Sequence, residues 1–258
     1  MPHFPIGVGD PRDPIAEADP WSRQVLFLEM YFDDTLISTG SGFIIAADRP
    51  YLVTALHSLT GRQPVTLKNK SDTAAWPNFV AYSGWYCKGR EPLYRDDNQP
   101  AAAQRRYLLH ERGSRIDVTL LPLSNGVPDH SILFRGFIDS DENSRYIRLF
   151  VSQTCHIIGY PQGLAIRPAV EVVFPVWKTG TIASEPYVNV DDDPKLLVDA
   201  RTFSGMSGAP VIVRQLNYTR LVGIYTGRTG DQSDIGYVFK PCVIHQLLTH
   251  GSDATDLN

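Results

Sequence analysis

The sequence predicts an all-β protein built from antiparallel barrels or sandwiches, on two observations. Many short β-rich or apolar runs, such as residues 51–55, 118–123 and 221–226, are separated by Gly, Pro, Asn and Asp turns. This spacing is typical of antiparallel sheets rather than of βαβ units. Helix-like periodicity is scarce, so we expect strands to form the core.

The one clear helical pattern lies near the C-terminus, where Pro241 suits a first-turn position and Gly251 a stop. Four apolar residues between them fall on one helical face: Val243, Ile244, Leu247 and Leu248. We therefore expect a single short C-terminal helix.

A polar, turn-rich stretch at residues 124–144 divides the chain into two halves of similar size. We place a boundary near residue 140, between an N-terminal β unit at 21–140 and a C-terminal β unit at 141–258. Residues 1–20 are expected to form an N-terminal extension. A chain of 258 residues is long enough for two small packed units.

Charge and hydropathy argue against nucleic acid and membranes as partners. The net charge is −4 and no Lys/Arg block stands out, so we expect neither nucleic acid nor an anionic membrane surface as a partner. No apolar run reaches the roughly 18 residues of a membrane span, and the residues after Met1 lack the order of a secretion signal. These features predict a cytoplasmic protein.

Residue spacing does not indicate a metal or a cofactor. Cys87, Cys155 and Cys242 are too far apart for a zinc site or a disulfide framework, so we expect reduced, mostly buried thiols. The acidic run at residues 191–193 lacks the spaced ligands of a calcium loop and is expected to be a solvated turn. We expect no metal and no cofactor.

Three short segments carry residues that together suit nucleophilic catalysis. TALH ends at His57 after an apolar run, IDVTLL places Asp117 before another, and SGMSGAP surrounds Ser207 with glycines. Each segment alone has an ordinary structural explanation, such as a turn or a cap. Their joint occurrence is what indicates a function.

The chemistry of acyl transfer assigns a role to each of these residues. An imidazole activates a serine hydroxyl by removing its proton, and a carboxylate orients the imidazole. We therefore expect Ser207 to be the nucleophile, His57 the general base and Asp117 the orienting acid. Gly205 and Gly208 let the backbone bend, so that the N–H groups of Gly205 and Ser207 form an oxyanion hole.

These segments resemble the trypsin and chymotrypsin superfamily of serine proteases, in particular its disulfide-poor bacterial branch with HtrA-like peptidase domains. The resemblance also includes GSGFII at residues 40–45, IIGYPQG at 157–163 and LVGIYTG at 221–227. It implies two six-stranded antiparallel Greek-key β-barrels with a short C-terminal helix. His57 and Asp117 would belong to the first barrel and Ser207 to the second.

The chain departs from the superfamily pattern in three respects. It has no activation N-terminus with an I-V-G-G-like start, which implies maturation without cleavage or another form of control. No PDZ-like segment follows the last apolar helix. Met206 puts a bulky apolar residue beside the nucleophile, where the family has G-N-S-G or G-D-S-G.

Two arginines predict the substrate preference. In the superfamily, the residue six positions before the nucleophile often lies at the base of the specificity pocket, and here it is Arg201. Arg228 follows the cleft-lining strand, whose last residues are Tyr225, Thr226 and Gly227. Two cations would favour cleavage after Asp or Glu. The alternative is that Arg201 pairs with an acid or faces solvent and that Arg228 is an ordinary surface residue.

The sequence thus predicts a serine endopeptidase that cleaves protein or peptide substrates through an acyl-enzyme. One alternative is a protease-like binding module that is catalytically silent or gated by a regulatory protein partner. An esterase with the same triad is another. An α/β-hydrolase is excluded, because Ala209 stands where the G-x-S-x-G elbow needs glycine and its serine would precede its histidine.

Overall fold

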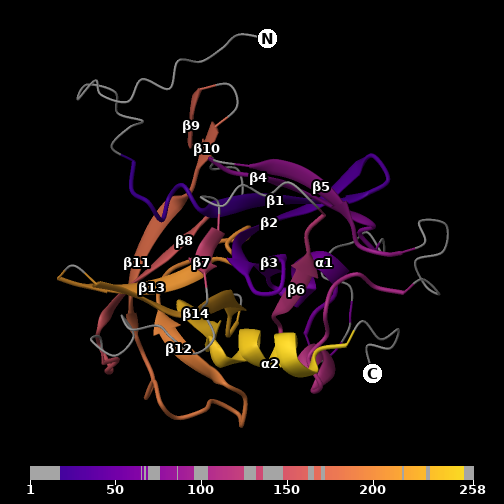
Figure 1. The fold of residues 1–258 in the computed structure, drawn as a ribbon. Helices are drawn as coiled ribbons and strands as arrows, with labels where there is room; N and C mark the ends of the chain where they lie inside the picture. The colour runs from indigo at the N-terminus through magenta and orange to yellow at the C-terminus, as the bar shows by residue number, and fades with distance from the viewer. Residues whose placement is uncertain are drawn as a thin grey trace.

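The structure, a computed structural model, has two β units that meet along a shared interface and a helix that packs beneath them (Figure 1). The predicted boundary at residue 140 and most of the predicted N-terminal extension lie outside the described residues. The structure describes residues 18–64, 66, 68, 76–85, 87–95, 104–124, 132–135, 148–161, 166–169, 172–216, 218–230 and 233–252.

The N-terminal unit is a curled, seven-stranded sheet. Its hydrogen-bonded order is β5-β4-β1-β2-β3-β6, and β7 pairs with β2 in parallel beside this path. The short helix α1 (Leu56–Thr60) follows β3, and the 3₁₀ turn η1 (Gly113–Arg115) precedes β6. The strands are β1 (Val25–Phe32), β2 (Thr35–Ala46), β3 (Pro50–Thr54), β4 (Phe79–Ser83), β5 (Lys88–Pro92), β6 (Thr119–Pro122) and β7 (Ile132–Arg135).

Strand β2 occupies the centre of this sheet. Asp33, with a φ of 52°, supplies the left-handed backbone of the turn that leads from β1 into β2. Phe43 of β2 lies opposite Val25 of β1 on one side and Val53 of β3 on the other. A strand that is paired and packed on both sides reads as a continuous apolar run, which explains the buried residues at 42–45.

Single bridges connect the two edges of the N-terminal sheet. Tyr94, just after β5, bridges Arg105, and Leu108 bridges Leu120 of β6. The segment at residues 104–108 therefore runs between the β5 edge and β6, and it curls the sheet toward a barrel.

The C-terminal unit is a closed barrel of six strands in the order β11-β12-β15-β14-β13-β8. A separate two-stranded hairpin of β9 and β10 projects from it (Figure 1). The elements are β8 (Thr154–Gly159), β9 (Ile166–Ala169), β10 (Val172–Phe174), β11 (Val176–Ile182), β12 (Lys195–Asp199), β13 (Pro210–Gln215), β14 (Tyr218–Arg228), β15 (Ile235–Phe239) and α2 (Cys242–His250).

The predicted all-β class and the short C-terminal helix are confirmed. The second barrel has the six strands that the resemblance implied. The first sheet has seven strands, because β7 adds to β2 in parallel, outside the antiparallel path.

Three apolar clusters form the core. One fills the N-terminal sheet around Leu28, Leu52 and Tyr107. A second fills the C-terminal barrel around Ile157 and Val211. The third, here called the interface core, combines residues of both units with α2. Its buried members are Val25, Phe43, Ile45, Tyr51, Val53, Ile116, Val118, Leu120, Ile158, Tyr160, Val173, Ile212, Leu221, Ile224, Phe239, Val243, Ile244 and Leu247.

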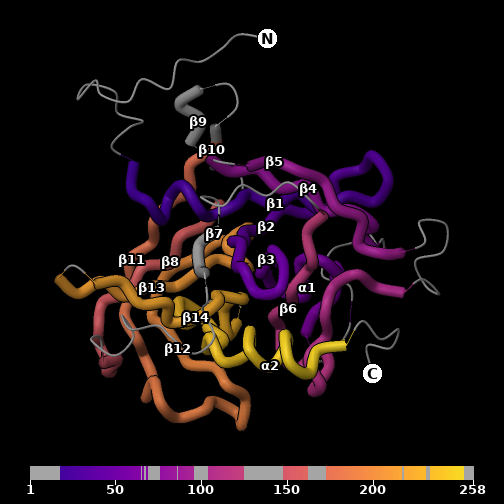
Figure 2. The backbone as a smooth tube through the Cα atoms, viewed as in Figure 1, coloured from indigo at the N-terminus to yellow at the C-terminus, as the bar shows by residue number. Residues whose placement is uncertain are grey.

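Helix α2 holds the two units together from one side. Val243, Ile244 and Leu247 of its predicted apolar face are buried in the interface core, and Leu248 packs against it. Figure 2 shows the helix extending from the C-terminal barrel toward β6 of the N-terminal sheet, which it contacts.

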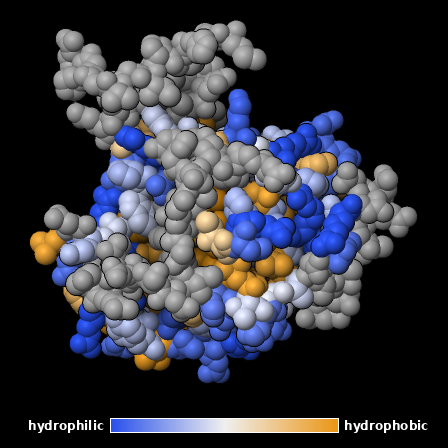
Figure 3. Space-filling view, in the orientation of Figure 1, coloured by the Kyte–Doolittle hydropathy of each residue, from blue (hydrophilic) through white to orange (hydrophobic). Residues whose placement is uncertain are grey.

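On the face shown in Figure 3, the described residues toward the rim are mostly hydrophilic. No helix in the described part of the chain is long and apolar enough to span a membrane. No disulfide bond joins Cys87, Cys155 or Cys242. Burial raises the pKa of Cys155 to about 12, whereas Cys242 is exposed, so the thiols are less buried than expected.

A buried tyrosine hydroxyl provides a test of the interface. The Tyr160 hydroxyl lies 3.1 Å from the carbonyl oxygen of Val25 and 3.0 Å from that of Val173. In Tyr160→Phe these buried carbonyls lose their donor, so we expect the free energy of unfolding in urea to fall by about 1–2 kcal/mol. Tyr51→Phe is the control, because its hydroxyl bonds Asp48 in a half-buried position. Equal decreases in the free energy of unfolding in the two variants would contradict a larger stabilising contribution from the Tyr160 hydroxyl.

Candidate active site

Strand pairing brings His57 and Asp117 together. β3 and β6 are antiparallel with Thr54 opposite Thr119, so the residues just after β3 lie beside those just before β6. His57, in α1, and Asp117 are 6% and 4% exposed. The imidazole Nδ1 lies 2.7 Å from Asp117 Oδ2, and the His57 backbone N–H donates to Asp117 Oδ1 at 2.9 Å.

This pairing sets the tautomer of His57. A carboxylate can only accept hydrogen bonds, so the proton of a neutral imidazole lies on Nδ1. The other ring nitrogen, Nε2, then carries the lone pair that a general base requires. The second carboxylate oxygen holds the backbone of His57, so one side chain fixes both the ring and its attachment point.

Ser207 comes from the other unit and lines the same cleft. It lies in the turn that leads into β13, and His57, Asp117 and Ser207 all line one cleft of about 700 Å³. The Ser207 hydroxyl has one hydrogen-bond partner among the described residues, the carbonyl oxygen of Thr226 at 3.2 Å. The nucleophile candidate therefore faces the cleft-lining end of β14.

The backbone around Ser207 leaves two amides available. Gly205 and Gly208 have φ values of 93° and 89°, a conformation that glycine adopts without strain. Met206 N–H donates to Phe203 O at 3.3 Å and Gly208 N–H to Tyr225 O at 2.7 Å. Within the described residues, the N–H groups of Gly205 and Ser207 have no such backbone partner. These are the two amides predicted to form the oxyanion hole.

Met206 does not crowd the nucleophile. Its side chain is 0% exposed and belongs to the apolar cluster inside the C-terminal barrel. The bulky residue beside Ser207 thus points away from the cleft, and it anchors the turn to the barrel by packing.

The structure brings four of the five predicted substrate-binding residues to the cleft. Tyr225, Thr226, Gly227 and Arg228 line it, whereas Arg201 is exposed and is not among the lining residues. Side chains alternate along the extended chain after β12, with Ala200 and Thr202 buried and Arg201 outward. Arg201 is therefore the one predicted substrate-binding residue that the structure does not bring to the cleft.

Neighbours that the sequence reasoning missed also shape this part of the cleft. Thr202 lines it, and its hydroxyl is hydrogen-bonded to the Tyr225 hydroxyl. Burial raises the pKa of Tyr225 above its usual value, and this effect outweighs the hydrogen bond with Thr202 and the charge of Arg228, which both lower the pKa. Phe203, which is 50% exposed, lies at the surface of the cleft. The alternation of apolar and charged residues in the sequence at residues 198–201 is the signal that would have placed Thr202 on the inward side.

Two residues of the acidic run at residues 191–193, Asp191 and Asp193, also line the cleft. Asp191 and Asp192 have φ values of 52° and 61°, so the two form a left-handed turn bridged by Val190 and Asp193. Asp193 is only 2% exposed. The expected solvated turn is therefore wrong for Asp193, which is buried by cations from two elements.

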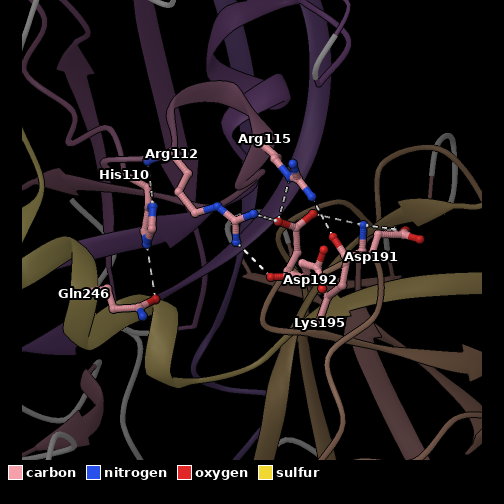
Figure 4. Close-up of polar contacts among 8 residues, drawn as sticks. His110, Arg112, Arg115, Asp191, Asp192, Lys195 and Gln246 are labelled. Carbon is pink, nitrogen blue, oxygen red and sulfur yellow. Dashed lines mark hydrogen bonds and ion pairs between the residues drawn. The ribbon is translucent and has the colours of Figure 1, made fainter.

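Asp193 is the centre of an ionic cluster that joins the two units. Figure 4 shows Arg112 and Arg115 pointing toward the turn at Asp191 and Asp192. Arg112 Nη2 and Arg115 Nε of the N-terminal unit lie 2.9 Å from its Oδ1, and Lys195 Nζ lies 3.3 Å from its Oδ2. Arg112 and Arg115 also donate to the backbone carbonyls of Asp192 and Asp191. Since Arg115 is two residues before Asp117, this cluster fixes the loop that leads to the candidate triad.

His110 connects the same loop to Gln246 of the C-terminal helix. The backbone N–H of Arg112 donates to its Nδ1 at 3.1 Å, so its Nε2 carries the proton and donates to Gln246 Oε1 at 3.2 Å (Figure 4). Within the described residues, no group of three or more His, Cys, Asp or Glu side chains is placed to hold a metal ion.

This geometry defines a class of protein, one with two packed β units and Ser, His and Asp gathered at their junction. Residues 40–224 match the family of trypsin-like peptidase domains. Because that match includes more than half of the chain, the protein belongs to this family. A comparison with curated proteins gave no match.

Solved structures agree on the fold. A serine endoprotease from Yersinia pestis is similar with a TM-score of 0.53 at 15% identity, over 88% of this chain and 62% of that one. This chain thus spans less than two thirds of the Yersinia chain. The active form of the Rv3671c protease from M. tuberculosis has the same TM-score and identity, over 88% of this chain and 80% of that one. An inactive form gives 0.51 at 17% identity, over 96% of each chain. The chymotrypsin-like fold is confirmed.

The ionic cluster yields a stability prediction. Asp193→Asn removes the charge that three cations share, and breaking a buried pair from one side is strongly unfavourable. Because its partners are partly exposed, we expect a loss of about 2 kcal/mol in the free energy of unfolding. The control is Asp192→Asn, next to it in the same left-handed turn but exposed. If both variants unfold at the same urea concentration, the cluster does not stabilise the fold.

Proposed function

We propose that this chain is a serine endopeptidase that cleaves protein or peptide substrates with Ser207, His57 and Asp117. The observation that carries the proposal is that a buried, oriented imidazole and a serine in a glycine turn line the same cleft. Among the described residues the N–H groups of Gly205 and Ser207 have no backbone acceptor, which leaves them able to bind an oxyanion. The Yersinia and M. tuberculosis structures are described as proteases, which supports the same activity here.

The reaction follows from these positions. His57 Nε2 takes the proton of Ser207 Oγ as the oxygen attacks the peptide carbonyl, and Asp117 stabilises the imidazolium that forms. The N–H groups of Gly205 and Ser207 bind the negative oxygen. His57 then gives its proton to the leaving amine, which leaves an acyl group on Ser207. A water activated by His57 hydrolyses this acyl-enzyme.

The orientation of Ser207 favours a second candidate, a gated enzyme. Its hydroxyl donates to the Thr226 carbonyl, so a rotation about χ1 must precede proton transfer to His57. One neutral hydrogen bond contributes about 1 kcal/mol net, equivalent to less than about tenfold in rate. A rotamer change of this size slows the reaction without preventing it, so the active enzyme remains the better-supported proposal. A regulatory protein partner would act on this turn.

A fluorophosphonate probe tests the activity. We expect the wild-type protein to be labelled, and Ser207→Ala and His57→Ala to lose labelling, because the probe reacts only with an activated serine. Ser184→Ala and His156→Ala serve as matched controls, since both residues lie outside the cleft lining, and we expect them to be labelled normally.

The outcomes separate the candidates. An unlabelled wild-type protein would count against catalysis, and labelling only when a partner is added would indicate gating. Hydrolysis of esters without any cleavage of peptides would favour the esterase over the endopeptidase.

The substrate preference that we propose is for Asp or Glu before the cleaved bond. Arg228 is an exposed cation at the cleft and forms no ion pair with any described residue. Arg115 and Lys195, by contrast, are engaged by Asp193. With Arg201 outside the cleft, the preference depends on Arg228 alone.

Arg228→Ala tests this preference. We expect kcat/KM for peptides with Glu before the cleaved bond to fall about tenfold, because a charge-assisted hydrogen bond is lost. Arg201→Ala, another exposed arginine, should leave it unchanged. A peptide library in which the wild-type protein cuts after Lys, Arg or Leu would contradict the proposed preference.

A further inference from the structure

Ser41 lies where the N-terminal sheet touches the nucleophile turn. It belongs to the GSGFII segment of β2 and is 0% exposed. Its backbone N–H donates to the carbonyl oxygen of Ser207 at 2.9 Å. This hydrogen bond is a direct connection between the central strand of one unit and the candidate nucleophile of the other.

The Ser41 hydroxyl makes a second connection, to the residue that supplies an oxyanion amide. Its Oγ is 2.8 Å from the carbonyl oxygen of Gly205 and 2.9 Å from the backbone nitrogen of Tyr160. An amide N–H can only donate, so the hydroxyl accepts from Tyr160 and must point its own proton at Gly205. The direction of the hydrogen bond to Gly205 is therefore fixed.

The atoms around Ser41 are closely packed, so no other hydrogen-bond donor has space to replace its hydroxyl. A Cβ atom at Gly159 would lie 2.7 Å from Ser41 Oγ, and one at Gly208 would lie 2.1 Å from Ser41 O. Thr54 Oγ1 donates to the same Ser41 carbonyl at 2.8 Å. Loss of the Ser41 hydroxyl would thus leave the Gly205 carbonyl without its donor in a closely packed, buried place.

We infer that Ser41 is a positioning residue that holds Gly205 so that its N–H faces the cleft. Glycine rotates more freely than any other residue, and Gly205 stays at a φ of 93°. The peptide that follows Gly205 is held at both ends, since its carbonyl accepts from Ser41 and its N–H, on Met206, donates to Phe203 O. Without the Ser41 hydroxyl, one of these two restraints is removed.

This inference rests on the proposed function, and it predicts a distinctive kinetic change. In Ser41→Ala we expect kcat to fall about tenfold to hundredfold with KM nearly unchanged, because an oxyanion donor acts in the transition state. The rate of fluorophosphonate labelling should fall in parallel. A merely structural role would lower the amount of folded protein but not the kcat of the folded fraction.

Thr54→Val is the matched control. It removes another buried hydroxyl that bonds Ser41, keeps the branched shape, and leaves the hydrogen bonds of Ser41 to Gly205 and Ser207 in place. We expect Thr54→Val to be destabilised while its kcat and labelling rate per folded molecule stay within about twofold of the wild type. An equal fall in kcat in the two variants, or no fall in Ser41→Ala, would overturn the inference.

A second readout does not depend on activity. In protein labelled with ¹⁵N-glycine, we expect Ser41→Ala to shift or broaden the amide signal of Gly205, and Thr54→Val to leave it in place. An unchanged Gly205 signal in Ser41→Ala would overturn the positioning role. A wild-type protein that neither labels nor cleaves would instead contradict the proposed function, so the two failures are distinguishable.

Discussion

The fixed contact between the two β units is the constraint on which the site depends. His57 and Asp117 belong to the N-terminal sheet, whereas Ser207 belongs to the C-terminal barrel. Neither unit alone contains the three groups, so their chemistry requires that the units do not slide or rotate. The interface core, closed on one side by α2, supplies that rigidity through close packing of large apolar side chains.

Directed polar contacts add to this non-directional packing. Apolar burial resists separation of the units but does not by itself fix a particular atom to within a fraction of an ångström. The Ser41 hydroxyl is hydrogen-bonded to the nucleophile turn, and the Tyr160 hydroxyl is hydrogen-bonded to β1. The Asp193 carboxylate forms an ion pair with the loop before Asp117. All three side chains are buried, where a satisfied hydrogen bond restricts geometry most strongly. The junction is thus held at several points around the cleft.

The sequence predicted local features of this protein better than it predicted contacts between distant segments. TALH, IDVTLL and GMSGAPV indicated His57, Asp117 and Ser207 because each segment carries its own strand or turn signal. Arg201 lies outside the cleft because side chains alternate along an extended chain, so that a shift of one residue changes which side chains face inward. The burial of Asp193 could not be foreseen, since two of its three cations come from residues 112 and 115, which no local pattern relates to it.

The structure of the protein after reaction with a fluorophosphonate tests the central claim most directly. We expect phosphorus bonded to Ser207 Oγ, with that oxygen rotated away from Thr226. A phosphonyl oxygen should lie about 2.7–3.1 Å from the backbone nitrogens of Gly205 and Ser207, while Ser41 keeps its hydrogen bond to Gly205. Phosphorus on another residue would contradict the role of Ser207 as nucleophile. A phosphonyl oxygen that faces solvent, with no hydrogen bond to either amide, would contradict the proposed oxyanion hole.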